Sequence, residues 1–458
     1  MPTLTFSLNP APLAVGLLPA PQLCYLLLKI SALGEDSARP VNWALVADAS
    51  RSMRIPIVDE HQFRALVREG GAQETLVDGV PVWQLSGPVP PDVRAASHSA
   101  LDHVARALHS VVERLDGQDR FALVACAEEA VLLTRSASGA DRVELVRGIS
   151  RLKTLNLGEQ TDLAHGIELG LNELRRGRDT QGVAGRADRL LLLTDGFTRR
   201  PEACIALASA AAAEGVAIST VGLGGEFQEE VLTALADRSG GHALFLHKPE
   251  DIPRAITAEL AAARAVAVRA VALHIAPADG VTVRRITRIR PALTTLSEAA
   301  DADSSGHPTD IPLGDIEAGA TVTLLLELLV PPDPKGTPAG HASLGRLALT
   351  SNGAPAADAE LVAIYQAGAP PHHPDVLDAA ARANAARLQR RALAATASGT
   401  PAEAARLLHA AAARLDDLGE RALADVARGQ ASALEQGGRA SPLATKELTY
   451  ATRRLGGE

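Results

Sequence analysis

Asp48, Ser50 and Ser52 stand at alternate positions and are the first residues whose types and spacing indicate chemistry. They follow an apolar run at 43–47, which predicts a strand buried on both faces of a parallel sheet. Polar groups at the carboxyl end of such a strand face the crevice where open α/β sheets bind ligands. One carboxylate and two hydroxyls suit Mg²⁺ or a similar hard cation, although the same residue types also form ordinary turns.

Two more stretches carry matching oxygen groups. The apolar run at 189–194 predicts a second buried strand and ends at Asp195, and Thr161 opens a helical pattern between the two strands. In this order the three parts resemble the metal-ion-dependent adhesion site of von Willebrand factor type A domains: D-x-S-x-S, a distant Thr and a second distant Asp. This resemblance implies that the metal ligands are Asp48, Ser50, Ser52, Thr161 and Asp195. Arg51 replaces the glycine of many relatives, and we expect it to leave these ligands intact.

The resemblance also implies a fold and a function. The fold would be a doubly wound, mostly parallel, Rossmann-like α/β sheet. The function would be cation-dependent protein binding, in which Mg²⁺, or else Mn²⁺ or Ca²⁺, keeps an open position that an Asp or Glu of a protein partner completes. An AAA+ ATPase or another assembly component is the kind of partner expected from bacterial intracellular relatives with an accessory β-sandwich and a helical tail.

Two other functions compete with this one. An open cation can activate water, so a metal-assisted hydrolase is one alternative. A structural scaffold with a vestigial metal site is the other. The sequence places no Ser/His or Cys/His pairing near the site, and His165, one turn beyond Thr161, is expected to pack rather than to catalyse. We therefore expect a binding module and not an enzyme.

Strands and helices alternate over residues 41–263, which predicts one α/β domain. The expected helices are 99–115, 141–152, 162–175, 201–213, 229–238 and 251–263, and the expected strands after the first are 120–125, 130–134, 189–194, 216–224 and 241–246. A short connection predicts that 120–125 and 130–134 form an antiparallel hairpin. The segment 222–227 lacks the last glycine of a dinucleotide-binding motif, so we interpret it as a turn.

Residues 54–97 form an insertion directly after the last serine ligand, which places it on the metal-site face. It is long for a loop inside a compact domain, and such loops are usually functional. Residues 75–85 predict a hairpin around Asp78 and Gly79, with Trp83 on the return strand. Trp83 either pins this hairpin to the domain or binds the partner, and it is our candidate partner-binding residue.

The remaining segments predict two further units. Apolar and polar residues alternate over 264–368, which is typical of a β-sandwich, and two strand-like runs within 1–40 are expected to complete it. Residues 369–458 are Ala-rich and helical, with an expected capping box at 400–403 and a third helix at 420–436. These helices either pack within the chain or offer a partner a groove. The His372–His373 pair is expected to be incidental, not a metal site.

Composition limits the classes of function. A chain of 458 residues is expected to hold two or three domains, and its net charge of −9 disfavours nucleic-acid binding. The three cysteines are scattered in apolar contexts, which predicts reduced core residues in a cytoplasmic protein. The amino terminus lacks signal-peptide features and no uncharged apolar stretch is long enough for a membrane span, so we expect no membrane partner.

Overall fold

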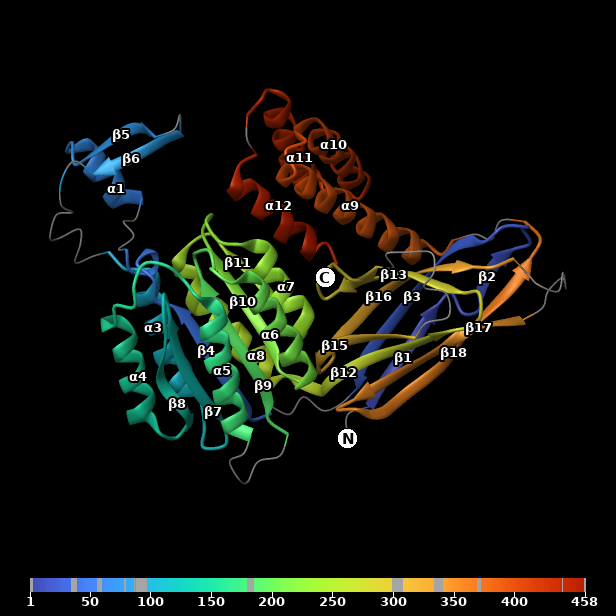
Figure 1. Cartoon of the computed structure of the whole chain (residues 1–458), viewed down its shortest axis with the longest axis horizontal. Helices are drawn as coiled ribbons and strands as arrows, with labels where there is room; N and C mark the ends of the chain where they lie inside the picture. Colours follow the sequence, from blue (N-terminus) through green and yellow to red (C-terminus); the bar gives the residue numbers. More distant parts are fainter. Residues whose placement is uncertain are drawn as a thin grey trace.

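The computed structural model describes residues 3–33, 39–55, 60–77, 80–85, 87, 97–178, 185–298, 308–332, 341–368, 372–438 and 440–456. Three bodies lie side by side in Figure 1: an α/β domain, a pair of β-sheets, and a group of C-terminal helices above the junction of the other two. Within the described residues, no helix has both the length and the apolar character needed to cross a membrane.

The α/β domain is built on one six-stranded sheet with the order β11-β10-β9-β4-β7-β8. Its strands are β4 (Val41–Asp48), β7 (Arg120–Cys126), β8 (Ala130–Ser138), β9 (Ala187–Thr194), β10 (Ala217–Leu223) and β11 (Ala243–Leu246). Neighbouring strands run parallel except for β8, which is antiparallel to β7. The β7–β8 hairpin expected from the sequence is thereby confirmed. Every residue of β4 and β9 is buried, because both strands lie inside the sheet and are covered on both faces.

Helices cover both faces of this sheet. One layer consists of α3 (Ala100–Arg114), α4 (Arg142–Thr154) and α8 (Ile252–Arg264), and the other of α5 (Leu163–Arg178), α6 (Pro201–Ala213) and α7 (Glu229–Ser239). Alternate residues of β4 point to the two layers: Trp43 and Leu45 pack with the first, and Val46 with the second. The expected α/β, Rossmann-like fold is confirmed.

Two glycines in this domain are required by close packing. A Cβ on Gly166 of α5 would lie 2.8 Å from Cγ1 of Val46, so glycine lets α5 sit directly on β4. A Cβ on Gly222 would lie 2.5 Å from the ring of Phe227, which is buried against α7 and Tyr450. The segment 222–227 is thus the end of β10 followed by a bend at 224–227, which admits a buried aromatic ring.

Two five-stranded sheets, with the orders β1-β3-β16-β13-β14 and β15-β12-β17-β18-β2, share one hydrophobic core. The first contains β1 (Thr3–Asn9), β3 (Gln22–Leu33), β16 (Thr321–Val330), β13 (Thr282–Arg290) and β14 (Thr294–Glu298). The second contains β15 (Thr309–Glu317), β12 (Val266–Pro277), β17 (His341–Ser351), β18 (Ala354–Gln366) and β2 (Leu13–Gly16). Strand β3 pairs with β16 and strand β2 with β18, so segments before residue 41 lie in the same sheets as segments after residue 264.

The C-terminal segment contains α9 (Pro374–Ala397), α10 (Pro401–Asp417), α11 (Arg421–Glu435) and α12 (Pro442–Arg454). These helices share a small-residue core, α9 also packs against β3 and β16, and Tyr450 of α12 enters the core of the α/β domain. The expected capping box is wrong. Thr400 precedes α10, but its side chain makes no capping bond and instead donates to the carbonyl oxygen of Ala395 at 2.9 Å.

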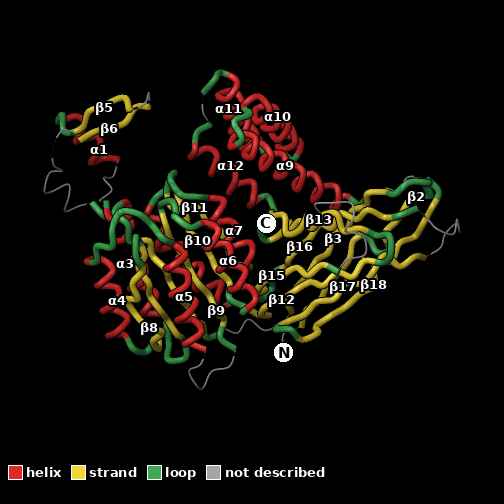
Figure 2. Tube along the Cα trace, in the orientation of Figure 1, coloured by secondary structure: helices red, strands yellow, loops and turns green. Residues whose placement is uncertain are grey.

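The insertion forms a small unit set apart from the α/β domain in Figures 1 and 2. It follows a short 3-10 helix, η1 (Ser52–Arg54), and contains α1 (Glu60–Arg68), β5 (Ala72–Val77) and β6 (Val80–Leu85). Strands β5 and β6 are antiparallel, with Val77 opposite Val80. Trp83 is in β6 opposite Glu74, but its side chain lies outside the described residues, as do Asp78 and Gly79.

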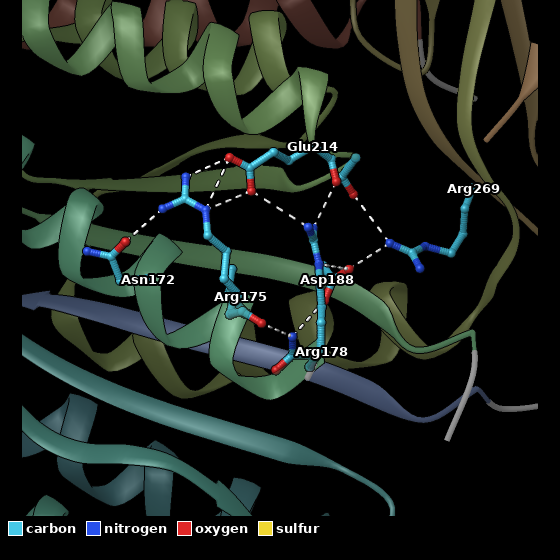
Figure 3. A network of polar contacts seen from close by, with 9 residues as sticks. Asn172, Arg175, Arg178, Asp188, Glu214 and Arg269 are labelled. Carbon is cyan, nitrogen blue, oxygen red and sulfur yellow. Dashed lines mark hydrogen bonds and ion pairs between the residues drawn. The ribbon is translucent and has the colours of Figure 1, made fainter. Parts of the chain in front are cut away.

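A polar network ties the α/β domain to the neighbouring sheet (Figure 3). Asp188 of β9 accepts from Arg178 of α5 at 2.9 Å and from Arg269 of β12 at 2.8 Å. Arg175 of α5 binds the carboxylate of Glu214, at the end of α6, through Nε and Nη2. The helix layer, the sheet and the next domain are therefore joined by charge-assisted hydrogen bonds around Asp188.

Candidate functional site

Asp48 forms the floor of the candidate site. It is the last residue of β4, it is fully buried, and three neighbouring groups donate to its carboxylate. The hydroxyl of Thr194 donates to Oδ2 at 2.5 Å and the backbone N–H of Ser50 donates to Oδ1 at 2.9 Å. The hydroxyl of Thr161 donates at 3.3 Å to Oδ2. The carboxylate is thus held in one orientation by two hydroxyls and a backbone amide.

Ser52 and Asp195 form the open side of the site. The hydroxyl of Ser52 donates to Oδ1 of Asp195 at 2.7 Å, and the hydroxyls of Ser50 and Ser52 lie 3.1 Å apart. Ser52 is exposed and Asp195 is half-buried, whereas Ser50 and Thr161 are buried. The structure thereby brings all five residues proposed from the sequence into one chain of polar contacts, with a buried floor and an accessible rim.

The sheet register explains why residues so distant in sequence meet. Ala47 of β4 lies opposite Leu193 of β9, and the strands are parallel, so Asp48 and Asp195 follow neighbouring strands at the same edge of the sheet. Thr161 reaches this edge through an isolated parallel bridge to Thr198, just beyond Asp195. The carboxyl ends of β4 and β9 and the start of α5 therefore determine the site.

The two acids of the site both have raised pKa values. Burial raises the pKa of Asp48, and burial together with the negative charge of Asp48 raises the pKa of Asp195 to about 6. Glu226 adds a further negative charge near Asp195. Among the described residues neither acid makes an ion pair with a Lys, Arg or His side chain. Two carboxylates that repel each other in a partly buried site are stabilised by any cation that binds between them.

Thr194 is a site residue that the sequence analysis missed. Its hydroxyl donates to Asp48 and accepts from the backbone N–H of Gly196 at 3.1 Å, so it connects the two strand ends. The only signal in the sequence is a hydroxyl residue directly before the second acid, at the end of an apolar strand. The sequence alone does not show that β9 pairs with β4, and this pairing brings the Thr194 hydroxyl to Asp48.

The rim of the site carries an ion pair and two apolar side chains. Arg51 donates to Glu159 at 2.9 Å, and both side chains are about 70% exposed. Phe197, two residues after Asp195, is 61% exposed, and Ile55, just beyond η1, is 56% exposed. Exposed apolar side chains therefore lie close in sequence to Asp195 and Ser52.

The donors fit a hard cation by their chemistry. All five side chains offer oxygen atoms, and only two of the five are charged. Within the part of the chain that the structure describes, no group of three or more His, Cys, Asp or Glu residues is placed to hold a metal. The hydroxyl-rich set at the ends of β4 and β9 is thus a different kind of site from a His or Cys metal centre.

The histidines noted in the sequence have structural contacts. Nδ1 of His165 accepts from the backbone N–H of Ala130 at 3.3 Å, which ties α5 to the start of β8. Nδ1 of His373 accepts from the backbone N–H of Asp375 at the start of α9 and lies 3.2 Å from the amide nitrogen of Asn9.

Comparison with known proteins identifies two regions of the chain. The sequence profile of the von Willebrand factor type A domain matches residues 94–258, a range that contains Thr161 and Asp195. Asp48 and the two serines precede this range, separated from it by the insertion. The profile described as the Sll0103-like, C-terminal alpha-helical domain matches residues 374–458.

Similar whole proteins give the same picture. The uncharacterized protein sll0103 of Synechocystis sp. is 23% identical over 238 residues, which cover 50% of this chain and 53% of that protein, so the match spans about half of each. A von Willebrand factor type A protein from Catenulispora acidiphila has a TM-score of 0.70 at 16% identity. The match covers 99% of this chain and 97% of that protein. The ArnB paralog VWA2 from Sulfolobus acidocaldarius has a TM-score of 0.54 at 14% identity. The match covers 100% of this chain and 99% of that protein. The chain therefore contains a von Willebrand factor type A domain followed by a C-terminal α-helical domain.

Proposed function

We propose that this protein binds a divalent cation at Asp48, Ser50, Ser52, Thr161 and Asp195 and uses the cation to capture an acidic side chain of a protein partner. Mg²⁺ is the preferred cation, with Mn²⁺ or Ca²⁺ as substitutes. The von Willebrand factor type A domain is a module commonly used in metal-dependent protein–protein interaction, and the proposal assigns that use to this chain.

One observation carries the proposal: at one edge of the sheet, two carboxylates meet three hydroxyls, and no basic side chain in the described part of the chain pairs with either acid. Burial and the negative charge of Asp48 both raise the pKa of Asp195, and a cation between the two acids would relieve this repulsion. Mg²⁺ favours oxygen ligands, few carboxylates and some exchangeable positions, which this set provides.

The accessible rim supports the second half of the proposal. Ser52 is exposed and Asp195 is half-buried, so a cation held there faces solvent on one side. Two carboxylates balance the charge of a dication, and a coordination position left open on the cation can still accept an oxygen of a partner carboxylate. Phe197 and Ile55 beside this opening offer apolar contacts to the protein that carries it.

Calorimetric titration of Mg²⁺ tests the cation site. The wild-type protein should bind one Mg²⁺, and Asp48→Ala and Asp195→Ala should abolish the binding heat. Glu226→Gln is the matched control, because it removes a nearby negative charge without removing a proposed ligand. Mg²⁺ binding that persists in Asp48→Ala would show that the site is misassigned.

Capture of partners from a lysate, with Mg²⁺ or with a chelator, tests the second half. A partner retained by the wild type should be lost both on chelation and in Asp195→Ala. The partner's own Asp or Glu should then be found by substitution, with an AAA+ ATPase as our first candidate class. A partner that remains bound without Mg²⁺ would contradict a cation-bridged contact.

The insertion is proposed to select the partner, with Trp83 as the candidate contact. This proposal is supported by the attachment of the insertion after η1, which begins at the proposed ligand Ser52. Replacing residues 56–94 with a short Gly/Ser linker should leave Mg²⁺ affinity nearly unchanged and alter which partner is captured. An unchanged partner with unchanged affinity would exclude a selective role.

Two further proposals complete this view. We propose a binding function rather than catalysis, and the accessory sheets and helices then serve as a frame for the metal-site domain. The three cysteines are buried and free of disulfides, which suits a reducing compartment such as the cytoplasm.

A further inference from the structure

A separate polar cavity lies where α9 and α10 cover the sheet formed by β3, β16, β13 and β14. Its volume is about 260 Å³, and its walls include Arg285 and Thr287 of β13 and Arg387 and Arg390 of α9. The cavity belongs to the helical and β-sheet bodies, not to the α/β domain that carries the cation site. Arg414 of α10 is a fourth arginine in this wall. The four arginines concentrate positive charge in a small cavity, so the groups that pair with them decide what the cavity can bind.

Two of these arginines are neutralised within the chain. Arg285 donates to both carboxylate oxygens of Glu327, at 2.9 and 3.0 Å, and also pairs with Glu298. Arg414, from α10, pairs with Asp417 at 3.0 Å. Glu327 is the acid in the cavity wall, and its charge is already taken up by Arg285.

The other two arginines lack a carboxylate partner among the described residues. Arg387 donates to the amide oxygen of Asn384 at 2.7 Å, and Arg390 donates to the hydroxyl of Thr295 at 2.7 Å. They are three residues apart on α9, so they lie on the same face of the helix. Desolvation lowers the pKa of Arg390 most, the negative charge of Glu298 opposes this shift, and the positive charges of Arg285 and Arg387 add to it. The two guanidinium groups thus stand together with no carboxylate bonded to either among the described residues, because the nearby Glu298 is itself paired with Arg285.

The cavity wall also holds buried donors without partners. Among the described residues, neither the hydroxyl of Thr287, a residue that is 2% exposed, nor Nε of Arg285, which is 8% exposed, has a hydrogen-bond partner. Buried polar groups without a partner are rare, because each loses its hydrogen bond to water. An N–H can only donate and a hydroxyl can donate, so these groups favour an acceptor. The wall therefore presents positive charge and donors together.

We propose that this cavity binds an oxyanion of the phosphate class, held by Arg387 and Arg390 and by the donors of Arg285 and Thr287. The planar fork of a guanidinium matches the oxygen geometry of phosphate, and charge-assisted hydrogen bonds are the strong ones. A bound anion would also join α9 to the sheet beneath it. This site is independent of the cation site proposed above.

The surroundings indicate room for a larger ligand. A second cavity of about 1190 Å³, between α6, α7, α9, α12 and strand β14, shares Thr295, Ala383 and Arg390 with the small one. A phosphate group at the arginine pair therefore has space for an organic body on the other side of Arg390. The ligand that fits both cavities is a phosphomonoester, and inorganic phosphate is its minimal form.

Inorganic phosphate is the first probe. Calorimetry and thermal unfolding of the full chain should show binding and stabilisation in phosphate, relative to chloride at matched ionic strength. Arg387→Gln and Arg390→Gln should each weaken phosphate binding about tenfold or more. Arg391→Gln is the matched control, because Arg391 is the next residue on α9, is exposed, pairs with Glu403 and lines neither cavity. No response beyond chloride, or an equal loss in Arg391→Gln, would overturn the proposal.

Phenyl phosphate distinguishes a phosphomonoester from free phosphate. It should bind more tightly than inorganic phosphate, because its ring enters the larger cavity. Ala386→Leu narrows only that cavity, so it should remove this advantage and leave inorganic phosphate binding unchanged. Equal affinities in the wild type would assign the small cavity to the free anion and overturn the larger ligand.

Discussion

Two aspartates of the α/β domain have opposite electrostatic surroundings. Asp48 is fully buried at the end of β4, and Asp237 lies in α7 with a side chain that is 16% exposed. Burial alone would raise the pKa of both. The pKa of Asp48 is indeed raised, because burial outweighs its hydrogen bonds from Thr194, Ser50 and Thr161. The pKa of Asp237 is lowered, because hydrogen bonds and charges from two arginines outweigh burial.

The source of those arginines explains the difference. Arg453 of α12 donates to both oxygens of Asp237 at 2.7 Å, and Arg288 of β13 donates to Oδ1 at 2.9 Å. Asp237 therefore joins the α/β domain to the sheets and to the last helix, and the chain itself supplies the counter-charge. At Asp48 and Asp195 the chain supplies hydroxyls instead. This contrast supports the proposal that a cation from outside the chain supplies the counter-charge of Asp48 and Asp195.

The largest expected effect is at Asp237. Asp237→Asn leaves Arg288 and Arg453 without their carboxylate, and breaking a buried ion pair in this way costs about 3–5 kcal/mol. Chemical unfolding should show this loss, and α12 should become more susceptible to proteolysis. A change below about 1 kcal/mol would mean that the arginines are solvated and that Asp237 does not join the three bodies.

Asp237 should also make the free energy of unfolding depend on pH. The pKa of Asp237 is below its ordinary value of 3.8 in the folded protein, so the unfolded chain takes up a proton first as the pH falls. The stability contributed by Asp237 should be complete above about pH 4 and should decline below it. The difference in unfolding free energy between wild type and Asp237→Asn should thus be constant from pH 7 to 5 and shrink below pH 4. A difference that grows on acidification would contradict the lowered pKa.

Asp48→Asn should have little effect on the stability of the cation-free protein, unlike Asp237→Asn. Without divalent cation, loss of the charge relieves the repulsion with Asp195 and disturbs only hydrogen bonds, so stability should change by no more than about 1 kcal/mol. Mg²⁺ at a hundred times its dissociation constant should stabilise the wild type by about 2.7 kcal/mol and leave Asp48→Asn unaffected. If Asp48→Asn destabilises the cation-free protein as strongly as Asp237→Asn, the comparison between the two aspartates fails.

The sequence predicts the two strand ends at the candidate site, because abrupt changes in polarity mark the ends of buried strands. The apolar runs before Asp48 and Asp195 are long enough to define buried strands, and the polar residue that ends each run marks the sheet edge. Thr194 could not be assigned in the same way. A hydroxyl at the end of a strand has many uses, and its donation to Asp48 depends on the pairing of β4 with β9.

Helix α12 lies within the segment 369–458 that was expected to be helical, but its own bounds were not predicted, for a different reason. Its buried residues include Lys446, Leu448, Tyr450 and Thr452, at every second position, which is the spacing of a strand. The helix lies between two bodies: Leu448 packs into the helical core and Tyr450 into the α/β core. A helix buried on two sides has no single apolar stripe, so helical periodicity does not reveal it. Sequence patterns identify elements with one buried face more readily than elements that join domains.

The smallest expected effect on stability is at the rim, where Arg51 and Glu159 form an ion pair. Removing this pair tests whether it contributes to the cation site. Both side chains are largely exposed, and exposed ion pairs contribute about 0–1 kcal/mol. Arg51→Gly removes the pair but keeps Ser50 and Ser52, so unfolding free energy and Mg²⁺ affinity should change little. Partner affinity should change more than either, because Arg51 stands beside the opening that a partner carboxylate must enter. An Mg²⁺ affinity that falls tenfold or more would show that Arg51 helps to shape the ligand loop, and the rim would then belong to the cation site itself.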